Sequence, residues 1–87
     1  MGILNRFTRT KYNDQEIVHR IETAIVEDPM IVDHGNVDIE SSKGVVTLSG
    51  FVRKSSQKDR IEGLARSTLR DAGLKFESID NKIEVHA

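Results

Sequence analysis

The chain has 87 residues, carries a formal net charge of −1 and contains no cysteine. These values limit it to one small domain without disulfides or thiolate metal sites, too small to enclose a large substrate pocket. The near balance of charge gives no general tendency to bind nucleic acid, and no apolar run is long enough to span a bilayer.

Residues 1–12 are predicted to form a flexible arm that is both basic and apolar. The arm lacks the continuous apolar stretch of a secretory signal peptide, because Asn5 and Arg6 interrupt it. As written, the sequence predicts a cytoplasmic protein at the periphery of a membrane, or a periplasmic one if the chain is a mature or excised fragment. Residues 13–87 are predicted to form the folded domain.

The first helix is predicted to begin at Asn13 or Asp14 and to end near Glu27. Either starting residue can cap the helix with a side-chain oxygen, and Pro29 disfavours helical geometry at the residue before it. The buried face follows helical spacing and consists of Ile17, Ile21, Ala24 and Ile25. The apolar residues 30–32 are expected to cover one end of the sheet.

Two strands joined by a turn follow. Residues 37–40 alternate between apolar and acidic side chains, which predicts a half-buried strand. Residues 41–44 form the turn, where Gly44 can adopt a positive φ, and residues 45–52 form the second strand. Gly50 falls on the inward face of that strand, at a cost in packing and backbone entropy. We therefore expect a core helix to press against the sheet at this position.

The second helix is predicted to begin with a capping box formed by Ser56 and Asp59. Gly73 is the expected stop at its C-terminal end. Its buried stripe consists of Ile61, Leu64, Ala65, Thr68 and Leu69. Residues 79–85 then alternate again and predict the last strand.

The predicted order of elements is α-β-β-α-β. The simplest arrangement that buries every apolar stripe is an α/β (α+β) sandwich, with two helices packed on one face of a three-stranded mixed sheet. The first two strands form a hairpin, and the third follows a helical crossover and can pair parallel to one of them. The order of the strands is left open by the sequence.

The sequence resembles the BON domain, a small bacterial module found mostly in envelope proteins. The resemblance rests on the run G-V-V-T-L-S-G-x-V at residues 44–52, on a helix, and on I-x-N-x-I-x-V at residues 79–85. It implies the same sandwich, with structural roles for Gly44, Gly50 and Asn81. It also implies binding to phospholipid surfaces, a part in envelope maintenance or stress response, and no shared catalytic residues.

Charge is strongly segregated along the chain. Residues 1–11 hold three basic residues and no acid, and residues 12–42 hold eight acids and one arginine. Residues 43–70 hold seven basic residues and two acids. The small net charge therefore conceals a basic arm, an acidic first half and a basic second helix.

The leading hypothesis is a module that binds an anionic phospholipid surface through the arm and the second helix. Apolar side chains of the arm would enter the interface while basic side chains reach the headgroups. The candidate residues are Ile3, Leu4, Arg6, Phe7 and Arg9 in the arm, and Arg53, Lys54, Lys58, Arg66 and Arg70 in or beside the helix. For Arg66 and Arg70, an ordinary solvated helix face is the competing interpretation.

Two alternatives remain open. The acidic and basic regions could bind a protein partner or a second copy of the chain. A small cation-binding regulator would use the carboxylates of Asp28, Asp33, Asp38 and Glu40, since hard cations prefer oxygen ligands. Their spacing matches no EF-hand loop, so a solvated acidic loop is the more ordinary interpretation.

We expect no enzymatic activity, no cofactor and no bound metal. The three histidines are widely spaced, and the chain has no HExxH arrangement. Ser49 lies in L-S-G and not in the nucleophile elbow G-x-S-x-G. Nucleic acid is not an expected partner, because the basic helix lacks interleaved aromatic residues and the acidic half would repel phosphate.

Overall fold

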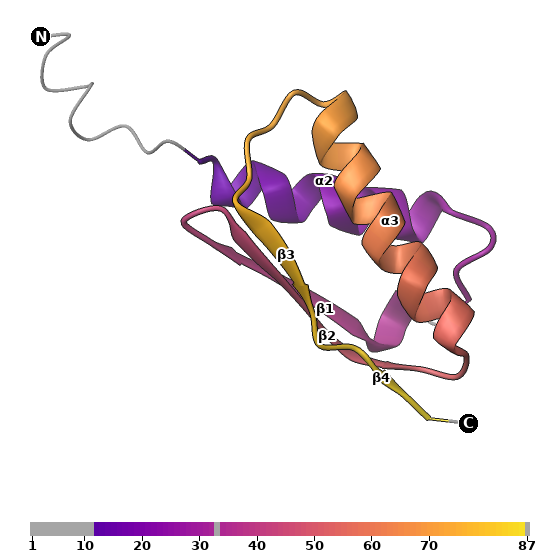
Figure 1. Cartoon of the computed structure of the whole chain (residues 1–87). Coiled ribbons are helices and arrows are strands. Elements are labelled where there is room, and N and C mark those ends of the chain that lie inside the picture. The colour runs from indigo at the N-terminus through magenta and orange to yellow at the C-terminus, as the bar shows by residue number, and fades with distance from the viewer. Residues whose placement is uncertain (1–11, 33, 87) are drawn as a thin grey trace, which may run out of the picture.

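The computed structural model describes residues 12–32 and 34–86. Both helices lie on one face of a small mixed sheet (Figure 1), which confirms the predicted α+β sandwich. Strand β2 is central, antiparallel to β1 and parallel to β3 and β4. The elements are α2 (Asp14–Glu27), the 3-10 helix η1 (His34–Asn36), β1 (Val37–Ser42), β2 (Val45–Val52), α3 (Ser55–Asp71), β3 (Ser78–Asn81) and β4 (Glu84–Val85).

The core lies between the helices and the sheet. The helical stripes predicted from the sequence supply most of it, and Val46, Leu48 and Val52 alternate inward along β2. Eleven apolar residues are buried in the described part of the chain: Ile17, Ile21, Ile25, Ile31, Val46, Leu48, Val52, Ile61, Ala65, Leu69 and Ile83.

The last strand is divided in two, where the sequence predicted one. β3 pairs Val45 with Ser78 and β4 pairs Phe51 with Glu84, so both parts keep the same register against β2. At the division, the side-chain oxygen of Asn81 accepts the N–H of Ile83 at 3.1 Å. The side-chain nitrogen of Asn81 donates to the carbonyl of Lys58 and to the carboxylate of Glu62, both at 3.1 Å. Asn81 thus joins the end of β3 to α3, a structural role of the kind that the family resemblance implies.

Gly50 has the predicted close backbone contact, but the predicted partner is wrong. It is the end of η1, and not a core helix, that reaches Gly50: a Cβ built there would lie 1.9 Å from the carbonyl oxygen of Asn36 and 3.1 Å from the Cα of Val37. Gly50 also has φ +105°, a conformation that side-chain-bearing residues rarely adopt. The glycine therefore allows the chain to pass from η1 into β1 in close contact with the neighbouring strand β2.

The hairpin turn is shorter than predicted. Ser41 and Ser42 still belong to β1, and only Lys43 (φ +51°) and Gly44 (φ +83°) form the turn. Two successive positive φ values are typical of the type I′ turns that suit the twist of paired strands. The expected role of Gly44 is therefore confirmed.

The carboxylate of Asp14 ties α2 to this turn. Its Oδ1 accepts bonds from the hydroxyl of Ser41 at 2.6 Å and the N–H of Gly44 at 3.0 Å, and its Oδ2 accepts the N–H of Lys43 at 2.8 Å. The cap of α2 is Asn13, whose side chain accepts the N–H of Glu16. Asn13 and Asp14 thus have separate roles: Asn13 caps the helix, and Asp14 makes the tertiary contact.

Tyr12 belongs to the domain and not to the predicted arm. Its ring covers Gly44, where an added Cβ would lie 2.6 Å from the ring carbon Cδ1. Its hydroxyl donates to the carboxylate of Glu77, which raises the pKa of the Tyr12 hydroxyl above its usual value. The other arm residues lie outside the described part.

The ends of α3 are only partly as predicted. Ser56 and Asp59 do not form a capping box, because the helix already begins at Ser55 and its cap residue is Lys54, which makes no capping bond with its side chain. The C-terminal prediction is confirmed, since Gly73 has φ +71°. The N–H of Leu74 bonds the carbonyl of Leu69 at 2.9 Å, as in a Schellman motif.

Replacing Gly50 by alanine should strongly destabilise the fold. We expect Gly50→Ala to lower the free energy of unfolding by about 3 kcal/mol or more, because it combines a backbone clash with an unfavourable φ. Gly63→Ala is the matched control: Gly63 lies within α3 with nothing within 4 Å of an added Cβ, so it should stabilise by about 0.5–1 kcal/mol. Urea denaturation measures both, and equal effects would contradict this account.

Asp14 should make stability depend on pH. Its bond from the Ser41 hydroxyl, followed by those from the turn N–H groups, lowers the pKa of this carboxyl. The stabilisation is therefore fully present above about pH 4, the unfolded value, and is lost as pH falls further. Asp14→Asn should lower the denaturation midpoint at pH 7 and differ less from wild type at pH 3. Glu40→Gln, which removes an exposed carboxylate on β1, should change the denaturation midpoint little at either pH.

Candidate functional site

The basic residues predicted to bind lipid fall into two groups along α3. Arg53, Lys54 and Lys58 lie at its start, whereas Arg66 and Arg70 lie toward its end. The distance along the helix axis from residue 54 to residue 70 is about 24 Å at 1.5 Å per residue. Arg66 also forms an ion pair with Glu62 at 3.3 Å. The structure thus favours the start of α3 as the more concentrated basic region.

The loop after α2 presents two apolar side chains beside this region. Ile31 is buried, with 3% of its surface exposed, whereas Met30 and Val32 on either side of it are 59% and 74% exposed. Pro29 and Met30 form a turn, in which the N–H of Ile31 donates to the carbonyl of Asp28 at 3.1 Å. The chain thus buries Ile31 and leaves its two neighbours facing outward.

The loop is held in place by α3. The side-chain nitrogen Nε2 of Gln57 donates to the carbonyl of Met30 at 2.7 Å, and its Oε1 accepts the N–H of Val32 at 3.2 Å. The N–H of Met30 also donates to Asp28 at 2.9 Å. The exposed side chains therefore project from a braced loop whose position is set by the first turn of α3.

Asp28 connects the end of α2 to α3. Its carboxylate accepts two bonds from the guanidinium of Arg60, both at 3.0 Å. This contact, together with the N–H of Met30, lowers the pKa of the Asp28 carboxyl. Its side chain is only 8% exposed, so the bidentate pair fixes the direction in which the loop leaves α2.

The predicted cation site is not formed among the described residues. Asp28 is engaged by Arg60 and by the loop backbone, and Asp33 lies outside the described part. Within residues 12–32 and 34–86, no group of three or more acidic or histidine side chains is placed to hold a metal ion. The three of these carboxylates that the structure describes, on Asp28, Asp38 and Glu40, therefore do not form one set of ligands.

The start of α3 adds positive charge to the loop. Arg53 and Lys54 are exposed, and Lys58 is half-buried one turn further on. The helix has no acidic residue in its first turn and no side-chain cap, so its N-terminal dipole reinforces the basic side chains. We call the set Met30, Val32, Arg53, Lys54 and Lys58 the apolar–basic end.

The arm joins the domain at the opposite end of α2. The described chain begins at Tyr12, beside the β1–β2 turn, whereas the apolar–basic end lies where α2 stops and α3 begins (Figure 1). The five arm residues predicted to bind lipid lie outside the described residues: Ile3, Leu4, Arg6, Phe7 and Arg9.

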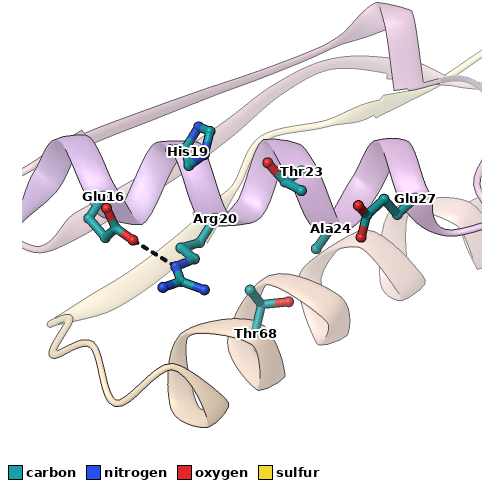
Figure 2. A pocket seen from close by; sticks show the side chains of 7 residues that line it. All are labelled: Glu16, His19, Arg20, Thr23, Ala24, Glu27 and Thr68. Atoms are coloured by element: carbon teal, nitrogen blue, oxygen red, sulfur yellow. Dashed lines mark hydrogen bonds and ion pairs between the residues drawn. The ribbon is translucent and has the colours of Figure 1, made fainter.

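A hollow of about 450 Å³ lies between α2 and α3. Figure 2 shows that Arg20 and Ala24 face the side of Thr68, while His19 and Thr23 point the other way. Arg20 is held by Glu16 at 2.7 Å. His19 is exposed. The ionisable side chains around this hollow do not converge on one point. The hollow is therefore a weaker candidate for a binding site than the apolar–basic end.

The geometry is that of a small α+β domain with one apolar and basic end. Residues 13–86 match the family described as BON domain, and the chain belongs to that family. BON domains are generally linked to binding phospholipid membranes. A search of curated proteins gave no match. In the part of the chain that the structure describes, neither helix is long and apolar enough to cross a bilayer.

Met30 and Val32 are the site residues that sequence reasoning missed. The segment was expected to cover the sheet, and only Ile31 does so. The run of apolar residues gave no signal that singled them out, because which residue is buried depends on the turn at residues 28–31. Gln57 gave no signal, since its role depends on contacts with residues 25 and 27 positions away.

Removing the brace should loosen the loop without unfolding the domain. Gln57→Ala should lower the free energy of unfolding by about 1 kcal/mol, because two partly exposed hydrogen bonds are lost. The Val32 amide, which donates to Gln57, should exchange its hydrogen faster in NMR experiments. Gln15→Ala, an exposed glutamine on α2, controls for the change in helix propensity. Unchanged exchange at Val32 would contradict the bracing role.

Proposed function

We propose that this protein is a non-enzymatic module that attaches reversibly to anionic phospholipid surfaces through the apolar–basic end. Membership of the BON family supports membrane binding in general. The observation that carries the specific site is the pair of exposed apolar side chains, Met30 and Val32, on a loop braced beside three basic residues. Such a combination suits the boundary between headgroups and acyl chains.

The magnitudes favour weak, salt-sensitive attachment. Burying one large apolar side chain contributes about 1.5–3 kcal/mol, and each basic residue near an anionic surface contributes about 1 kcal/mol. Two apolar and three basic residues must also offset the loss of rotational and translational freedom. The electrostatic attraction between the basic side chains and the membrane decays over a Debye length. Because that length shortens as the salt concentration rises, the attraction weakens.

The arm supplies a second contact in this proposal. Its residues Ile3, Leu4 and Phe7 would add apolar surface, and Arg6 and Arg9 would add charge. Eleven extended residues span at most about 36 Å, whereas α2 is about 21 Å long. An arm attached at the far end of α2 is therefore long enough to reach the same membrane plane. Attachment at the cytoplasmic face and a part in envelope maintenance or stress response belong to the same proposal.

Self-association through segregated charge is the alternative. Two contacts in the structure reduce its driving force, because Arg60 is paired with Asp28 and Arg66 with Glu62 inside the domain. These internal pairs leave fewer basic side chains on α3 for an acidic partner. Light scattering across a range of salt concentrations separates the two functions, since a lipid-binding monomer keeps one mass throughout.

The test is co-sedimentation with vesicles containing phosphatidylglycerol. The variant Met30→Asp/Val32→Asp should bind at least about tenfold more weakly than wild type, since each 1.4 kcal/mol is a factor of ten and both insertion and charge become unfavourable. Lys54→Glu/Lys58→Glu should weaken binding at low salt and lose its effect at high salt.

Val45→Asp is the matched control. Val45 is also an exposed apolar residue, but it lies beside the β1–β2 turn, away from the apolar–basic end. It should retain wild-type binding. Equal losses for all variants, or no sedimentation of the wild-type protein at low salt, would overturn the proposed site.

A further inference from the structure

A groove runs along the flank of α2 that faces β1. It consists of two adjoining hollows of about 340 Å³ each, which share Glu22 as a lining residue. The first begins at Asp14, and the second ends at His34 and Gly35. We call them together the α2–β1 groove; its apolar lining is Val18, Ile25, Val26, Val37 and Ile39.

The groove is open because the sheet places β1 at an edge. Among the described strands, β1 pairs with β2 alone, and α3 packs over β2, β3 and β4. Val26 is 62% exposed, and Val37 and Ile39 are only half-buried. The groove is therefore an apolar surface with no covering element in the described part of the chain.

The lining of the groove carries negative charge. Its acidic residues are Asp14 and Glu22, and no lysine or arginine is among the residues that line the two hollows. Asp14 is already bonded to the β1–β2 hairpin, so Glu22 is the acidic side chain that faces an occupant. An occupant should therefore combine apolar side chains with positive charge.

Residues 1–11 have this combination and the necessary reach. They hold Arg6, Arg9 and Lys11 without an acid, together with Ile3, Leu4 and Phe7. They precede Tyr12, two positions before the lining residue Asp14. Their extended length of at most about 36 Å exceeds the roughly 21 Å length of α2. We propose that the α2–β1 groove binds the chain's own N-terminal segment, residues 1–11.

Another hollow, near Tyr12, is the competing location for residues 1–11, and its charge argues against it. That hollow, of about 420 Å³, is lined by Tyr12, Arg70, Leu74, Lys75 and Phe76. It is apolar enough for the segment, but Arg70 and Lys75 would repel its three basic residues. Binding within one chain is favoured over binding to a second copy, because a short tether gives a local concentration in the millimolar range.

This inference goes beyond the proposed function and does not depend on it. A segment bound in the groove keeps its apolar and basic side chains away from other surfaces. Where an anionic membrane is present, the acidic groove and the membrane compete for the same side chains. The groove then acts as an internal competitor that raises the lipid charge density needed for the segment to engage.

The test is a distance measurement by NMR on the full chain without lipid. Because the protein has no cysteine, Asn5→Cys provides one site for a spin label. Amide signals of Val26, Val37 and Ile39 should lose more than half of their intensity relative to the reduced label. Glu22→Lys in the labelled chain should restore these signals, whereas Asp59→Lys, with the same change in net charge on α3, should not.

Three results would contradict the proposal. Loss of intensity at residues 70–76, or no loss beyond the immediate neighbours of Tyr12, would overturn the assignment. A mixture of spin-labelled chains with isotope-labelled chains that carry no spin label tests the second-copy version. Loss of signal at the groove in that mixture would show that the segment binds another molecule and would overturn the intramolecular proposal.

Discussion

The carboxylate of Asp14 is the contact on which the position of α2 depends. It accepts three hydrogen bonds from the β1–β2 hairpin, two of them from turn N–H groups that strand pairing leaves without partners. At the other end of α2, Asp28 accepts two bonds from Arg60 of α3. An aspartate at each end thus attaches the helix, first to the sheet and then to the second helix, and both carboxyl groups have lowered pKa values.

These attachments shape both of the proposed binding surfaces. The contact at Asp14 places α2 over the edge strand β1, which leaves the α2–β1 groove along its flank. The contact at Asp28 directs residues 30–32 toward the first turn of α3, where Gln57 bonds the loop. The opposite charges of the two surfaces follow from the sequence, since α2 is acidic and the start of α3 is basic.

Local sequence patterns predicted the fold well. They did not reveal the contacts made by single polar side chains. The helical stripes, the hairpin and the stop at Gly73 depend on spacing and backbone conformation, which sequence records directly. The contacts of Asn81 beside the break between β3 and β4 depend on where one side chain points. The contact at Gly50 was predicted in kind but assigned to the wrong element, because a bare Cα shows that something comes close and not what it is.

The candidate site was less predictable for the same reason. The basic residues at positions 53–70 spread along a helix, so Lys54 and Arg70 lie at opposite ends of α3. Conversely, Met30 and Gln57 are far apart in sequence and are joined by a hydrogen bond. Sequence therefore supplied the basic candidates on α3, and the structure added the loop that carries Met30 and Val32.

The distribution of charge also restricts how the domain can meet an anionic surface. Helix α2 carries four acidic residues and β1 carries two more, and turning these elements toward a negatively charged membrane would be unfavourable. The far end of α3 offers Arg70 and Lys75, but Leu74 and Phe76 beside them are half-buried and so have less apolar surface to insert. The apolar–basic end has both exposed apolar side chains and positive charge. In that orientation the α2–β1 groove stays in solvent, where it can hold a basic segment that the membrane has not engaged.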